Sequence, residues 1–106
     1  MNEKDKKDKK ENQINVVLPP EIADGVYSNL AIISHSTDEF VLDFLSIVPG
    51  VPDAKVKSRI ICTPQHAKKL LRALSDNIQR YENSFGEIIE YEHKMPNINT
   101  KFYGEA

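Results

Sequence analysis

The chain has 106 residues, a formal net charge of -2 from 14 basic and 16 acidic side chains, and a single cysteine. This length suits one small domain and excludes a multidomain enzyme, while one cysteine excludes a disulfide scaffold and the near-balanced charge excludes a strongly basic nucleic-acid binder. No apolar run reaches the roughly 18 residues that a membrane span needs. The lysine-rich start has no apolar stretch behind it, so no secretory signal is visible and we expect a cytoplasmic protein.

Both ends of the chain are predicted to lie outside the folded domain. Residues 1–12 are charged or polar and hold no apolar side chain after Met1. Because such a segment cannot bury enough surface to offset the entropy of ordering it, we interpret it as a disordered charged tail. Residues 91–106 contain Pro96 and show little periodicity, so we expect a mobile C-terminal tail. Residues 13–90 are then expected to form a single α+β domain.

Three β-prone segments with short connections follow one another in the first half of the chain. They span residues 26–34, 40–48 and 55–62. Short connections favour an antiparallel meander. An earlier apolar run, residues 14–18, is stopped by Pro19 and Pro20, so it predicts an edge strand at best. We therefore expect an antiparallel sheet of three to four strands.

A long amphipathic helix is predicted after the third segment. Thr63 can cap it, Pro64 suits its first position and Gly86 offers a C-terminal stop. Apolar side chains recur between these residues at steps of three and four: Ala67, Leu70, Leu71, Leu74, Ile78, Tyr81 and Phe85. That spacing indicates an α-helix of about six turns with one apolar face, which we expect to pack on one face of the sheet.

Apolar residues on both faces of the sheet predict a homo-oligomer. A hairpin turning near residues 36–39 would pair Ile33 with Leu42 and Ala31 with Phe44, and these side chains would share one face. The other face would hold Leu30, Ile32, Val41, Leu45 and Ile47. One helix covers only one face, so we expect this second set to form the interface with another copy of the chain. The alternative is that residues 14–18 and the C-terminal segment cover it within one chain.

Three short motifs carry a family resemblance. They are EFVLDF at residues 39–44, PQHAK at residues 64–68 and YENSFG at residues 81–86. With these motifs the sequence resembles, over residues 14–89, a family of short bacterial and archaeal proteins catalogued as a domain of unknown function. The resemblance supports the domain limits. It implies no activity, substrate or cofactor, and it transfers no catalytic residue.

Asp43 is an acid inside an apolar strand, and a buried carboxylate must be paired to stay ionised. In a meander, Arg59 lies about opposite it on the third strand. We predict a cross-strand or intersubunit ion pair between them, with a site for a charged ligand as the alternative. Tyr27 and Asn29 project from one side of the first strand and could either add polar contacts to such a site or bond neighbouring backbone groups.

No catalytic, cofactor or metal site is predicted. Cys62 and His66 near a helix N-terminus could form a nucleophile pair, but Cys62 shares its strand parity with Val56 and Ile60, which indicates a core side chain. The histidines, His35, His66 and His93, are scattered and lack the close spacing of metal ligands. We therefore expect a protein that is not an enzyme.

Basic side chains offer an alternative function. Six of them fall on the third strand and the start of the helix: Lys55, Lys57, Arg59, Lys68, Lys69 and Arg72. On one surface they would form a patch able to meet phosphates, although acids in the C-terminal half dilute it. The sequence thus favours a small, non-catalytic, oligomeric interaction or adaptor module that binds proteins. The alternative is a nucleic-acid-associated accessory protein that uses this patch.

Overall fold

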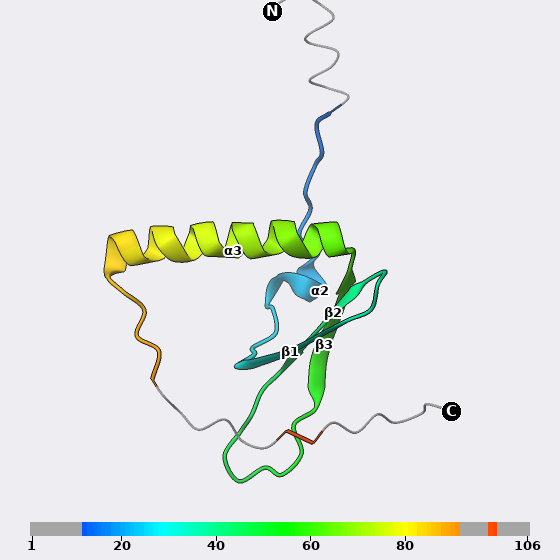
Figure 1. Cartoon of the computed structure of the whole chain (residues 1–106), viewed down its shortest axis with the longest axis vertical. Helices are drawn as coiled ribbons and strands as arrows, with labels where there is room; N and C mark the ends of the chain where they lie inside the picture. Colours follow the sequence, from blue (N-terminus) through cyan, green and yellow to red (C-terminus); the bar gives the residue numbers. More distant parts are fainter. Residues whose placement is uncertain (1–11, 92–97, 100–106) are drawn as a thin grey trace, which may run out of the picture. The chain divides into compact units, whose positions relative to one another are not determined.

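The computed structural model describes residues 12–91 and 98–99. The elements in chain order are α2 (Pro20–Ala23), β1 (Leu30–His35), β2 (Phe40–Leu45), β3 (Val56–Cys62) and α3 (Pro64–Phe85) (Figure 1). The chain divides into two compact units, one ending at Pro64 and one beginning at Gln65. The first unit holds the sheet, and the second holds the long helix from its second residue onward.

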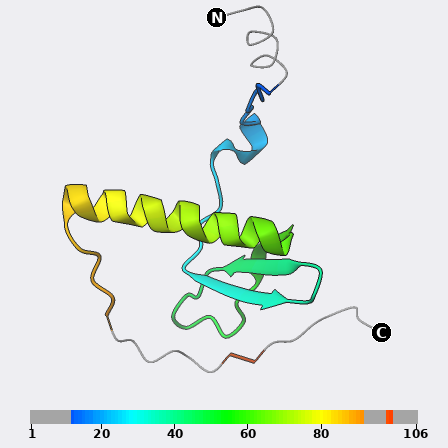
Figure 2. The same ribbon diagram turned by 45° about the horizontal axis from the view of Figure 1, so that its top comes forward.

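The sheet is antiparallel and has the strand order β1-β2-β3, so β2 is the central strand. Figure 2 shows β1 and β2 as adjacent arrows running in opposite directions. The predicted α+β class, with an antiparallel meander and one long helix, is confirmed. The register also pairs Ile33 with Leu42 and Ala31 with Phe44, as the hairpin prediction required. Residues 14–18 are not part of a strand, so the sheet formed by the described residues has three strands.

β1 begins at Leu30, later than predicted, because the two preceding residues bond through their side chains. The Asn29 amide donates from Nδ2 to the Ile47 carbonyl at 2.9 Å and accepts from the Ile47 N–H at 2.7 Å. The Ser28 hydroxyl lies 3.0 Å from the Leu30 carbonyl and 2.9 Å from that of Leu45. The Asn29 side chain thus takes the place of a peptide group and extends the pairing of the hairpin beyond the strand itself.

The turn between β1 and β2 is closed by Ser36. Its N–H donates to the Glu39 carbonyl at 2.9 Å. Its hydroxyl accepts from the N–H groups of Asp38 and Glu39 at 3.2 and 3.3 Å. A serine side chain that bonds the backbone two and three residues on is a common way to stabilise a tight turn.

β3 carries a bulge that the sequence pattern did not reveal. Phe44 pairs with Ser58 and Leu45 with Val56, so Lys57 is an extra residue without a partner on β2. The bulge breaks the alternation of faces along β3. Cys62 therefore shares a face with Ile60 but not with Val56, which corrects the parity predicted for these three residues.

Few side chains are buried. Among the described residues the buried apolar side chains are Leu42 and Leu45, with 7% and 4% of their surface exposed, and both lie on the central strand. All residues of α3 are described, and none is buried. The helix ends as predicted, because Gly86 has a φ of 94° and its N–H donates to the Glu82 carbonyl at 2.9 Å. Glycine adopts this left-handed conformation without steric cost.

We predict that Asn29→Asp destabilises the hairpin. The carboxylate still accepts from the Ile47 N–H, but it repels the Ile47 carbonyl that has lost its donor. The free energy of unfolding should fall by about 1 kcal/mol in urea titrations followed by circular dichroism. Asn15→Asp makes the same chemical change at an exposed position and should leave the midpoint unchanged. Equal midpoints for the two variants would show that the Asn29 amide does not stabilise the fold.

Candidate functional site

Asp43 on β2 and Arg59 on β3 form a bidentate ion pair. The Arg59 Nε donates to Asp43 Oδ1 at 2.6 Å, and a terminal guanidinium nitrogen donates to Oδ2 at 2.9 Å. Asp43 is 7% exposed, whereas 49% of the Arg59 side chain is exposed. The structure therefore brings together the two residues for which the sequence predicts an ion pair, and it does so across two strands of one chain.

The hydrogen-bond alternation of the sheet explains why this pair is so close. Ser36 and Glu39 form a hydrogen-bonded pair, and in an antiparallel ladder hydrogen-bonded and non-hydrogen-bonded pairs alternate. Asp43 then directs its backbone groups towards β1, so its position opposite Arg59 is a non-hydrogen-bonded pair. Side chains of such pairs lie closest together, which suits a bidentate contact.

The ion pair keeps the buried carboxylate charged. Hydrogen bonding from Arg59 lowers the pKa of Asp43 below its usual value; burial opposes the shift, and the guanidinium charge reinforces it. Both carboxylate oxygens accept from Arg59. This arrangement fits a structural role in the sheet better than proton transfer, which would require a carboxylate open to a substrate.

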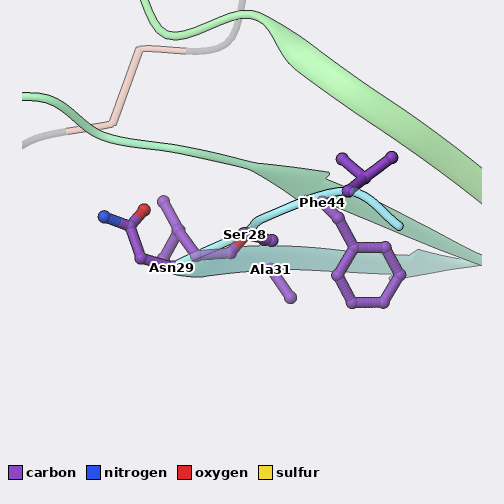
Figure 3. A pocket seen from close by; sticks show the side chains of 6 residues that line it. Ser28, Asn29, Ala31 and Phe44 are labelled. Atoms are coloured by element: carbon purple, nitrogen blue, oxygen red, sulfur yellow. The ribbon is translucent and has the colours of Figure 1, made fainter. Parts of the chain in front are cut away.

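A shallow hollow of about 410 Å³ lies beside the start of β1 (Figure 3). Its lining residues are Val26, Ser28, Asn29, Leu30, Ala31 and Phe44. The polar side chains at its rim, Ser28 and Asn29, bond backbone groups of the hairpin. In Figure 3 the small Ala31 side chain and the Phe44 ring lie on the same side of the sheet. The hollow is therefore suited to an apolar contact.

The six basic residues of the alternative function are not gathered on one element. Arg59 is bonded to Asp43, Lys57 is the bulged residue, and Lys55 precedes β3. The other three, Lys68, Lys69 and Arg72, belong to the second unit, on α3. Lys55 lies outside the strand and Lys57 has no partner in the register, so the common strand parity predicted for the first three cations stays a prediction.

The predicted oligomer interface is only partly exposed. Leu45 belongs to the core of the chain, whereas Leu30, Ile32, Val41 and Ile47 are half-buried. The interface therefore stays a prediction. More exposed apolar side chains lie elsewhere on the sheet, and Ile33, with 60% of its surface exposed, is the most exposed of those on β1 to β3. Alternation predicts the faces of the residues on β1 and β2, but it cannot tell which of two apolar faces is covered.

The remaining candidates for catalysis or metal binding are Cys62 and the histidines. Cys62 is half-buried at the end of β3, and His66 is in the first turn of α3. His93 lies outside the described residues. Within residues 12–91 and 98–99, no three histidine, cysteine or carboxylate side chains are grouped to hold a metal ion. No helix in these ranges has the length and apolar character to cross a membrane.

Residues 1–90 match DUF3467, a family of proteins of unknown function, and the chain belongs to this family. The resemblance noted from the sequence motifs is thereby confirmed at the level of the family. No curated protein and no solved structure matches the chain.

We predict that Arg59→Met is more harmful than Asp43→Asn. Arg59→Met leaves a buried carboxylate without its guanidinium and should lower the free energy of unfolding by about 2 kcal/mol. This is less than for a fully buried ion pair, because the Arg59 side chain is half-exposed and water screens its charge. Adding Asp43→Asn to Arg59→Met should restore part of the loss. Lys57→Met removes a cation of β3 outside the ion pair and is the control. If the double variant is no more stable than Arg59→Met alone, Asp43 and Arg59 are not energetically coupled.

The ion pair also predicts a pH dependence. The pKa of Asp43 is lowered in the folded state from its ordinary 3.8, so its stabilising effect is present above that pH. The effect disappears as the pH falls through the lower folded value. The stability difference between the native protein and Asp43→Asn should therefore shrink in acid, measured by urea unfolding between pH 7 and pH 2.5, and a constant difference would contradict it.

Proposed function

We propose that this DUF3467 protein is a non-catalytic interaction module that works in the cytoplasm as a homo-oligomer and binds other proteins. The observation that carries the proposal is the small number of apolar side chains buried within one chain. Leu42 and Leu45 are the buried apolar residues of the described part, although the sheet and α3 present many more.

The helix gives the strongest support. Its apolar stripe includes Leu71 and Phe85, which are 67% and 77% exposed. The other exposed residues of the stripe include Leu74, Ile78 and Tyr81. Burying one large apolar side chain contributes about 1.5–3 kcal/mol, and a small domain is stable by only about 5–15 kcal/mol. Covering such a stripe would therefore supply a large share of the stability of the folded protein, and association with another chain is one way to cover it.

The polar groups support a structural rather than a catalytic interpretation. The Asp43 carboxylate is held by Arg59, and the Asn29 amide is held by Ile47. Their hydrogen bonds stabilise the sheet. Large apolar side chains of the sheet and of α3 stay exposed in the described part, which suits binding to protein surfaces better than chemistry on a small substrate.

Light scattering coupled to size exclusion tests the proposal. We expect a mass above that of the monomer, 12.1 kDa, and little change when the salt concentration is raised. Leu71→Gln removes an exposed apolar side chain of the stripe and should weaken association about tenfold. Arg72→Gln, on the polar face of the same helix, is the matched control and should leave the mass unchanged.

Two outcomes would redirect the interpretation. A monomer at every protein concentration would contradict the oligomeric module. Nucleic acid that elutes with the protein and is released by salt would favour the alternative function based on the basic residues.

A further inference from the structure

β1 is an edge strand, and no strand of the described residues pairs with its outer side. By the ladder alternation, Leu30, Ile32 and Ser34 bond β2, so the N–H and C=O groups of the remaining residues point away from it. These outward residues are Ala31, Ile33 and His35. Within the described residues, no backbone bond outside the ladder with β2 involves them.

The two edges of the sheet differ in their protection against pairing. β1 has the sequence LAIISH, without proline, bulge, lysine, arginine or carboxylate. β3 has a bulge at Lys57 and carries Arg59. Bulges and charged side chains are the devices by which edge strands avoid pairing with other chains, and a long apolar edge without them is a site of association.

We propose that two copies of the chain join through their β1 edges, antiparallel about a two-fold axis at Ile33, and form one continuous six-stranded sheet from two three-stranded ones. The inference rests on the proposed function and names the partner as a second copy. Each outward N–H of one copy then meets an outward C=O of the other. Ile33 faces the partner's Ile33, which covers the most exposed large apolar side chain of the three strands.

Side-chain sizes match in this register. Ala31 faces the partner's His35, so the smallest side chain of the strand meets the one ring that the strand carries. The hollow beside Ala31 and Phe44 lies on the side of the sheet to which the partner's His35 would belong. Within each chain the His35 ring is stacked on Phe40 with centroids 5.3 Å apart, which holds the ring on that face.

Charge favours β1 over β3 for pairing between identical copies. Arg59 lies near the middle of β3, so antiparallel self-pairing there would place the arginines of the two copies opposite each other. Self-pairing of β1 brings no two lysines, arginines or carboxylates together. A strand of another protein could use the same backbone groups, but the match of Ala31 to His35 arises when the partner is the same chain.

Proline at Ile33 tests the pairing. Ile33→Pro removes an N–H that points away from β2, and proline is tolerated at edge positions of this kind. Ile33→Ala also removes most of the isoleucine side chain but keeps the backbone N–H, so it is the matched control. By analytical ultracentrifugation, Ile33→Pro should weaken self-association about tenfold or more relative to Ile33→Ala. Equal association of the two variants would overturn the pairing, while an oligomer that persists in both would leave the proposed function intact.

Amide exchange gives a measurement that does not depend on a variant folding. In the native oligomer the N–H groups of Ala31, Ile33 and His35 should exchange slowly, whereas the outward N–H of Ile61 on β3 should exchange fast. Fast exchange at all three β1 positions in a proven oligomer would overturn the β1 pairing, and a native monomer would overturn both proposals. If the β1 amides exchange slowly in the native protein but fast in Val16→Pro, the exposed segment of residues 14–18 pairs with β1. That result would contradict the pairing of two β1 strands.

Discussion

The ion pair between Asp43 and Arg59 sets the register between the central strand β2 and β3. A slip of one residue would leave a buried carboxylate opposite Ser58 or Ile60 and expose it to the full cost of an unpaired charge. This register in turn decides which side chains of β2 and β3 share a face. The composition of each face of the sheet therefore depends on this one contact.

A second constraint is the shortage of buried apolar surface. The charged pair occupies a position on the central strand that an aliphatic residue could fill, and the buried apolar residues flank it on either side. Small domains have little excess stability, so a core of this size makes the apolar stripe of α3 and the edge of β1 important for the folded state. Association with another chain would then add to the stability of the folded state.

Local patterns predicted the elements well. The Thr63, Pro64 and Gly86 signals bracket α3, and the alternation around Ile33 and Leu42 gave the hairpin register. The pairing of Asp43 with Arg59 could be expected because a lone buried acid needs a partner on an adjacent strand. Features that depend on contacts distant in sequence were missed. The start of β1 depends on the bond of Asn29 to Ile47, and the Lys57 bulge leaves no sign in the residue types.

The unequal connections of the sheet have a consequence for the order of folding. β1 and β2 are joined by the tight turn that Ser36 closes, whereas the chain from Leu45 to Val56 forms a longer loop. Short loops cost less closure entropy, so we expect the hairpin to form first and Asp43 to remain hydrated until β3 docks. In that order the ion pair is a late contact of folding, and we expect it to stabilise the protein mainly by slowing unfolding.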